Sequence, residues 1–247
     1  MVAPAKRPIT GSGSLLISYR LSRSTPILII GAGKEAAGRL YYALDASAPV
    51  IIIAPDDNHV DPTLRKRILE WPQMVEWRKR DWSIQDLNDN IDIVFSCLES
   101  LEESQKIYLA CKERHLLCNC ADLPSCCDFY FPSTLRRGPV QIAVSTNGNG
   151  PRMAARIRKV IDDVLPQSVG LAVEKIGDLR RKLQFATGGI GGIDAGKRMS
   201  WVSQLCDSWS WEELAALSDT DIEYLIKEFE KGSPTPLTPS SRINGKY

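Results

Sequence analysis

The sequence predicts an α/β fold whose parallel sheet is covered by helices on both faces. Residues 26–30 and 50–54 are short runs of mostly branched apolar residues, which is typical of strands buried on both faces of a sheet. Between them, residues 34–45 carry apolar side chains at helical spacing. Strand, helix and strand in this order make a βαβ unit, and the alternation continues to about residue 121.

The later elements follow the same pattern and then leave it. Residues 74–78 are a candidate third strand, and residues 91–98 and 116–121 are two clearer ones. Ser100 and Glu103 form a capping-box signature that opens a helix ending near Arg114. After about residue 131 the alternation stops.

The second half of the chain predicts one strand and several helices. Residues 139–145 favour a strand, and Pro151 begins a basic helix. A further helix is expected over 169–185, and Ser210 with Glu213 resembles another capping box. The segment from Gly232 onwards is rich in Pro and Ser, so we expect it to be disordered.

Composition excludes several classes of function. Among 247 residues, the formal net charge is +1, so no overall field favours nucleic acid or an anionic membrane. No apolar run approaches the roughly 20 residues of a membrane helix, and the N-terminus does not resemble a secretory signal. The odd number of cysteines, several of them in apolar segments, indicates free thiols in a reducing compartment and thus a cytoplasmic protein. They are Cys97, Cys111, Cys118, Cys120, Cys126, Cys127 and Cys206.

A glycine turn follows the first predicted strand. Residues 31–36 read G-A-G-K-E-A and fit the pattern G-x-G-x-x-A. Gly31 permits the tight turn, Gly33 lets the backbone approach a pyrophosphate, and small Ala36 lets the helix pack on the sheet. The helix N-terminus then offers unpaired N–H groups to the phosphates. The sequence therefore predicts a Rossmann domain that binds NAD, the alternative being a packing turn without a ligand.

An acidic residue stands where the adenosine ribose is expected. Asp56 follows the second strand and Pro55, at the distance from Gly31 typical of a ribose-binding acid. A carboxylate there accepts hydrogen bonds from both ribose hydroxyls and repels a 2′-phosphate, which favours NAD over NADP. Asp57 is the rival for this role.

Two other motifs are set aside. Residues 191–197 spell G-x-x-x-x-G-K, but Arg198 replaces the hydroxyl residue of a phosphate-binding loop and no strand precedes it, so we interpret this stretch as a linker. The cysteines between Cys118 and Cys127 have the spacing C-x-C-x₅-C-C, which matches no common metal site. We expect no metal site.

Residues 118–151 carry a specific resemblance. The segments N-x-A-D-x-P, C-D-F-Y-F and S-T-N-G-x-x-P-R resemble the fungal siroheme-biosynthesis enzymes, which are bifunctional precorrin-2 dehydrogenases and sirohydrochlorin ferrochelatases. The chain is also similar to the N-terminal half of bacterial siroheme synthase. The likeness extends over roughly residues 14–185.

The resemblance implies three domains and two reactions. It implies an NAD-binding Rossmann domain over 1–131, a small α+β dimerisation domain over 132–168, and a helical C-terminal domain over 169–247 that includes the disordered tail. It implies a homodimer that oxidises precorrin-2 with NAD and then inserts ferrous iron, a substrate, to give siroheme. No nucleic acid or membrane is expected as a partner.

The resemblance makes Asp122 the catalytic residue of both reactions. Asp122 ends an apolar strand, at the edge where open α/β sheets place ligands. A carboxylate there is a suitable acceptor for the protons lost in dehydrogenation and metal insertion. The alternative from the residues alone is a turn or helix cap before Pro124.

The resemblance also assigns cofactor and substrate residues. Besides the glycines, it places at the NAD site Lys34, Glu35, Pro55, Asp56, Ser96 and Cys97. The tetrapyrrole would be bordered by Ser145, Thr146, Asn147, Gly148 and Arg152. Further cations for the substrate carboxylates are Arg136, Arg137, Arg156, Arg180 and Arg181, the alternative being a solvated basic surface.

Other functions stay open on the sequence alone. A non-catalytic NAD-sensing regulator would share the glycine turn, and some relatives oxidise the substrate without inserting iron well. A short-chain dehydrogenase is not supported, because no Tyr-x-x-x-Lys pair follows the sheet.

Overall fold

The chain forms two compact units, Met1–Phe131 and Pro132–Tyr247. The computed structural model describes residues 15–19, 21, 24–88, 90–191 and 194–233. The predicted disordered tail lies outside the described residues except for Gly232 and Ser233. No helix in the described ranges is both long and apolar enough to span a membrane.

The first unit is a five-stranded parallel sheet in the order β3-β2-β1-β4-β5. Its strands are β1 (Ile27–Ile30), β2 (Val50–Ile53), β3 (Val75–Arg78), β4 (Ile93–Ser96) and β5 (Leu117–Cys120). Its helices are α1 (Lys34–Asp45), α2 (Pro62–Glu70) and α3 (Leu101–Glu113), with short turns η1 (Ile84–Asp86) and η2 (Pro124–Cys126). Helix α2 was not predicted from the sequence; Asp61 caps it by accepting from the N–H groups of Thr63 and Leu64.

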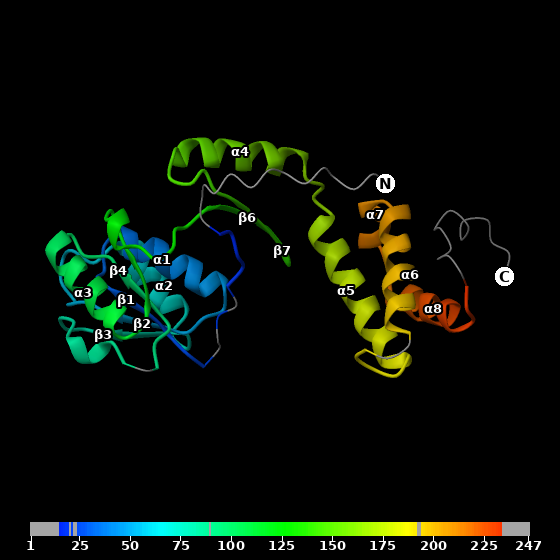
Figure 1. The fold of residues 1–247 in the computed structure, drawn as a ribbon, viewed down its shortest axis with the longest axis horizontal. Helices are drawn as coiled ribbons and strands as arrows, with labels where there is room; N and C mark the ends of the chain where they lie inside the picture. Colours follow the sequence, from blue (N-terminus) through cyan, green and yellow to red (C-terminus); the bar gives the residue numbers. More distant parts are fainter. Residues whose placement is uncertain (1–14, 20, 22–23, 89, 192–193, 234–247) are drawn as a thin grey trace. The chain divides into compact units, whose positions relative to one another are not determined.

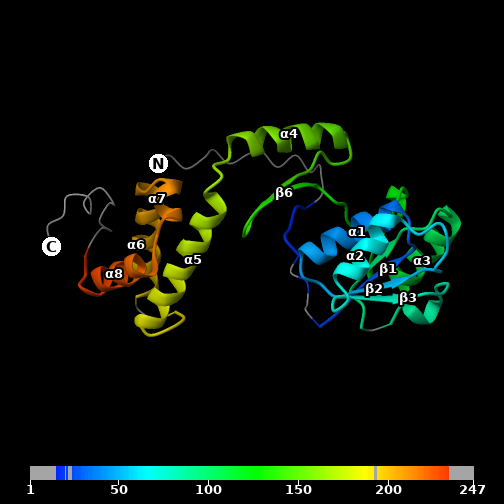
Figure 2. The ribbon, with the colours of Figure 1, turned by 180° about the vertical axis from the view of Figure 1, so that it is seen from behind.

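Alternate residues of the strands build two separate hydrophobic cores. Ile27 and Ile29 of β1 pack with α1 and α2, whereas Leu28 and Ile30 pack with α3. Helices α1 and α2 therefore lie on one face of the sheet and α3 on the other, as both views show (Figures 1 and 2). The predicted α/β fold class is confirmed.

The second unit combines a β-hairpin with helices. Strands β6 (Ser133–Arg137) and β7 (Val140–Val144) pair antiparallel, and α4 (Pro151–Val164) packs on them. Leu179 and Leu183 of α5 (Val169–Ala186) anchor a helical core. That core includes residues of α6 (Ala195–Ser208) and α8 (Asp219–Glu230), with α7 (Trp211–Ala215) between these helices in the chain. The predicted helical C-terminal region and the capping box of Ser210 with Glu213 are confirmed.

The glycine-rich stretch before α6 is a connection between helices, as its interpretation as a linker predicts. Arg198 of α6 is buried, and its guanidinium donates to the carbonyl oxygens of Thr187, Gly189 and Gly191. The residue that breaks the phosphate-binding pattern thus holds the described part of this connection against α6.

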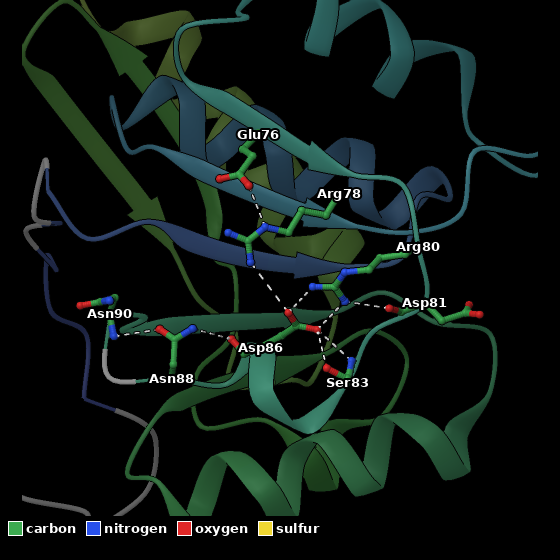
Figure 3. A network of polar contacts seen from close by, with 8 residues as sticks. All are labelled: Glu76, Arg78, Arg80, Asp81, Ser83, Asp86, Asn88 and Asn90. Carbon is green, nitrogen blue, oxygen red and sulfur yellow. Dashed lines mark hydrogen bonds and ion pairs between the residues drawn. The ribbon is translucent and has the colours of Figure 1, made fainter.

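A buried acid fixes the segment after β3 (Figure 3). The carboxylate of Asp86 is only 5% exposed and accepts two hydrogen bonds from the Arg80 guanidinium, at 2.6 and 2.9 Å. Ser83 donates its N–H and hydroxyl to the same carboxylate, and an Arg78 Nη1 atom lies 3.8 Å away. The Arg80 hydrogen bonds, opposed by partial burial, hold the pKa of Asp86 below its ordinary value.

We expect Asp86→Asn to lower the free energy of unfolding by about 1–3 kcal/mol at pH 7, because an amide leaves charged donors unpaired. Since the folded-state pKa of Asp86 is lowered, its contribution is complete above the unfolded value of about 3.9. It is lost as the pH falls through the folded value. Urea unfolding at pH 7 and near pH 3 measures this, and the difference between wild type and variant should shrink at the lower pH. Asp81→Asn is the matched exposed control, and an equal loss there would contradict the assignment.

Candidate functional site

The carboxyl ends of the five strands form one continuous edge. Main-chain hydrogen bonds extend the sheet one residue beyond the strands, so the segments that follow β3, β2, β1, β4 and β5 lie in that order. The bonds run from Ala54 N–H to Arg78 O (3.3 Å), Gly31 N–H to Ile53 O (2.9 Å), Cys97 N–H to Ile30 O (2.8 Å) and Ala121 N–H to Ser96 O (2.9 Å). From β1 the chain adds β2 and β3 on one side and then β4 and β5 on the other, so the strand order reverses between β1 and β4. Open α/β sheets bind ligands at such a point.

The glycine turn lies at the centre of this edge. Gly31 has φ of +110°, and a Cβ there would lie 2.8 Å from the carbonyl carbon of Cys97, so only glycine fits. Gly33 has an ordinary φ of −80°, and a Cβ there would meet no atom within 4 Å. Glycine is therefore required at Gly31 by the close approach of the Cys97 main chain, whereas at Gly33 it leaves open space beside the turn.

The N-terminus of α1 is ready to receive an anion. Gly33 is its N-cap and provides no side-chain hydrogen bond, and the first helical bond runs from Ala37 N–H to the Gly33 carbonyl. Lys34 and Glu35 are exposed in the first turn. Uncapped N–H groups, a helix dipole and open space over Gly33 together fit the pyrophosphate of a dinucleotide.

The predicted ribose acid lies on the β2 side of the glycine turn. Asp56 lies two residues beyond Ala54, directly after exposed Pro55. Its carboxylate pairs with Arg65 Nη1 at 2.6 Å and with Lys79 Nζ at 2.7 Å. These two hydrogen bonds lower the pKa of Asp56, the Lys79 contribution being the larger. The rival Asp57 accepts the His59 N–H at 2.8 Å through Oδ1. Neither cation was predicted as a site residue, although Lys79 directly follows a predicted strand.

On the other side of the turn lie Ser96 and Cys97. The Ser96 hydroxyl is fully buried and bonds the Ser104 hydroxyl of α3 at 2.9 Å, so only its main chain reaches the edge. Burial raises the pKa of the Cys97 thiol to about 12, which keeps it protonated at neutral pH. Cys97 therefore offers a neutral surface beside the turn rather than a nucleophile.

Asp122 lies beyond β5, at the far end of the edge. It is exposed and has φ of +57°, a left-handed conformation that is uncommon outside glycine. Its carboxylate makes no hydrogen bond or ion pair with any residue in the described ranges, and η2 has Leu123 rather than Asp122 as its N-cap. The turn-cap alternative thus has no hydrogen bond to support it. Neighbouring strands are about 4.8 Å apart, which puts β5 roughly 10 Å from β1.

The predicted substrate turn lies in the second unit, between β7 and α4. Asn147 and Gly148 have φ of +49° and +80°. Ser145 Oγ accepts the N–H of Asn147, and Thr146 Oγ1 accepts the N–H of Gly150, each at 3.2 Å. Arg152 is exposed in the first turn of α4.

The cysteines belong largely to the hydrophobic core. All seven are free, and Cys118, Cys120 and Cys126 are buried in the α3-side core. No group of three or more His, Cys, Asp or Glu side chains among the described residues is arranged to hold a metal ion. This part of the sheet is therefore packed core.

Comparison with known proteins agrees with these assignments of fold and family. Residues 20–133 match a family model described as "Putative NAD(P)-binding". Residues 137–163 match the model for the sirohaem biosynthesis protein central region, and residues 166–235 match that for its C-terminal region.

Fungal and bacterial relatives cover different lengths of the chain. The siroheme biosynthesis protein met8 of Schizosaccharomyces pombe is 38% identical over 234 residues, covering 95% of this chain and 86% of that protein. Its counterpart in Saccharomyces cerevisiae is 28% identical and is covered to 98%. The siroheme synthase of Zymomonas mobilis is 31% identical over 162 residues, which cover 66% of this chain and 33% of that protein.

A solved structure supports the fold. The structure described as SirC, precorrin-2 dehydrogenase, has a TM-score of 0.63 and covers 88% of this chain and 100% of that one, at 18% identity. At this identity the likeness concerns the fold alone. The extent and identity of the match to the fungal proteins decide the family: this chain belongs to the siroheme biosynthesis proteins.

Proposed function

We propose that this protein oxidises precorrin-2 to sirohydrochlorin with NAD and then inserts ferrous iron to give siroheme. The observation that carries the proposal is Asp122, an exposed carboxylate in a left-handed conformation at the end of the edge that begins with Asp56 and the glycine turn. Such backbone conformations are concentrated at functional sites. Membership of the siroheme biosynthesis family supports precorrin-2 as the substrate.

The arrangement along the edge gives each part of the cofactor a partner. We place the pyrophosphate on Gly33 and the first turn of α1, and the adenosine ribose beside Asp56 on the β2 side. The nicotinamide then lies on the β4 side, beside Cys97. Asp122 follows one strand further along, where a macrocycle stacked on the nicotinamide would meet it.

The proposed oxidation divides one hydride and one proton between two acceptors. NAD, when bound, supplies the hydride acceptor. Asp122 takes the proton that leaves the macrocycle, as a general base does. In the second reaction, ferrous iron enters as a substrate while two pyrrole N–H protons leave, and Asp122 accepts them one at a time and passes each to solvent. The neutral Cys97 thiol adds no charge beside the nicotinamide.

We assign recognition of the tetrapyrrole to the turn at Ser145, Thr146, Asn147 and Gly148 and to Arg152. The hydroxyls of Ser145 and Thr146 hold the main chain of this turn, which fixes its shape before a substrate arrives. An exposed guanidinium such as that of Arg152 pairs with carboxylates in a two-pronged geometry.

We also propose that the protein is a homodimer and that residues 132–168 form the dimerisation domain, with the helical domain following from 169. On α4, the exposed apolar residues recur at intervals of four, three and four, as in a helix that packs on a partner. They are Met153 (53% exposed), Ile157 (42%), Val160 (59%) and Val164 (74%).

We expect Val160→Glu to dissociate the dimer, because a carboxylate buried at an apolar interface without a partner is strongly unfavourable. The dimer dissociation constant should rise by about 100-fold or more, roughly 3 kcal/mol. Sedimentation at several concentrations measures it. Lys159→Glu changes the charge of a neighbouring exposed residue off this stripe and serves as the control. A dimer that survives Val160→Glu unchanged would remove α4 from the interface.

Turnover by the purified protein tests the proposed function. We expect precorrin-2 and NAD to yield sirohydrochlorin and NADH, followed by siroheme when ferrous iron is added. Oxidation without iron insertion would reduce the assignment to a dehydrogenase, and NAD binding without any turnover would favour an NAD-sensing regulator. We infer a cytoplasmic location from the seven free cysteines, since reducing compartments keep thiols unpaired.

A further inference from the structure

Two cations flank the acid at the ribose end of the edge. Arg65 comes from α2 and Lys79 directly follows β3, yet both reach the Asp56 carboxylate, at 2.6 and 2.7 Å. Arg65 also donates from Nη2 to the carbonyl oxygen of Asp57 at 2.9 Å. The two positive charges therefore converge on one point from separate elements.

An aromatic ring orients the same two cations. The Arg65 guanidinium carbon lies 5.4 Å and the Lys79 ammonium 4.8 Å from the centroid of the Trp77 ring. The ring is fixed in turn, because Trp77 Nε1 donates to the carbonyl oxygen of Ala54 at 3.0 Å. Cation–π contacts of this kind favour one position of a long, flexible side chain.

Arg65 and Lys79 offset the negative charge of the acids at this end of the edge. A ribose-binding carboxylate repels a 2′-phosphate only while its own charge is uncompensated. Here Asp56 and Asp57 carry two negative charges, and Arg65 and Lys79 carry two positive ones. The cations remain accessible, since the side chains of Arg65 and Lys79 are 40% and 57% exposed. A guanidinium near the ribose acid is also what accommodates the 2′-phosphate of NADP in related folds.

We infer that Arg65 and Lys79 form a phosphate-recognition pair at the adenosine ribose, so that this protein binds NADP as well as NAD. The inference rests on the proposed cofactor site. When NADP binds, the two cations share their hydrogen bonds between Asp56 and the 2′-phosphate. When NAD binds, they stay on Asp56, whose remaining lone pairs accept the ribose hydroxyls.

Calorimetric titration of the full chain with NAD and with NADP tests the inference without any turnover. We expect the two wild-type dissociation constants to agree within about tenfold, since screened surface charges discriminate weakly. Lys79→Ala and Arg65→Ala should each raise the NADP constant about tenfold or more, the range of one charged hydrogen bond. The NAD constant should change less than about threefold. Lys66→Ala, which removes an α2 lysine paired with Glu70 instead, should change neither.

A third variant, at Asp56, should change the two dissociation constants in opposite directions. Asp56→Asn releases both cations while keeping the shape of the side chain, so the NADP constant should fall while the NAD constant rises. NADP binding more than about 100-fold weaker than NAD in the wild type would overturn the inference and leave the proposed function standing. An equal loss of both cofactors in Lys79→Ala and Arg65→Ala would also overturn it. Failure of the wild type to bind either cofactor would overturn the proposed function itself.

Discussion

Asp122→Asn is expected to lower the rate of precorrin-2 oxidation by about 100- to 10,000-fold, the range that one general base contributes. Asparagine has nearly the shape of aspartate and also tolerates the left-handed conformation that Asp122 adopts, so the turn should survive. It cannot accept the proton that leaves the macrocycle. The measurement is the single-turnover formation of NADH at saturating NAD. Iron insertion should fall with oxidation, because the same carboxylate receives the pyrrole protons.

The same variant should still bind NAD with a dissociation constant within about threefold of the wild type, since no more than a weak surface contact is removed. Asp92→Asn is the matched control: Asp92 is also exposed, but it precedes β4 and so lies at the opposite edge of the sheet. Unchanged rates in Asp122→Asn would remove the catalytic role. Equal losses in both variants would indicate an effect of net charge.

Alanine at Gly33 should weaken NAD binding, whereas alanine at Gly31 should destabilise the fold. Gly33→Ala fits the free protein, because no atom lies within 4 Å of the added Cβ. The Cβ would instead occupy the space that we assign to the pyrophosphate. We expect NAD affinity to fall about 100-fold or more, roughly 3 kcal/mol, while the free energy of unfolding changes by only about 1 kcal/mol.

Gly31→Ala should damage the fold itself. Its φ of +110° is unfavourable for alanine, and the Cβ would collide with the Cys97 main chain at the join between β1 and β4. A loss of about 3 kcal/mol or more in unfolding free energy is expected. Thermal unfolding with and without NAD separates the two variants. Normal NAD binding by Gly33→Ala would contradict the placement of the pyrophosphate.

The sequence predicts the parallel sheet well because its strands have a simple signature. Strands β1 and β2 are buried on both faces and are therefore continuously apolar, and the helix between them begins at the glycine turn. The less buried elements α2 and β6 were not predicted from the sequence. Helix α2 has a single fully buried residue, Leu64, and β6 alternates between half-buried and exposed residues. Their formation depends on tertiary packing more than on local pattern.

Only the parts of the candidate site that have a local sequence pattern were predicted. Residues of the glycine turn and the end of β2 are recognisable by spacing, which identifies Gly33 and Asp56. Arg65 and Lys79 are close to Asp56 only because β3 pairs with β2 and α2 crosses between them. The left-handed conformation of Asp122 has no sequence signal, since aspartate adopts it only where the surrounding turn requires it.

A crystal structure of the protein with NAD bound would show directly in which direction the cofactor runs along the sheet edge. We expect the adenosine ribose beside Asp56, the pyrophosphate on the main chain of Gly33, and the nicotinamide on the β4 side between Cys97 and Asp122. A nicotinamide on the β2–β3 side, or a cofactor that leaves the glycine turn untouched, would contradict this expectation.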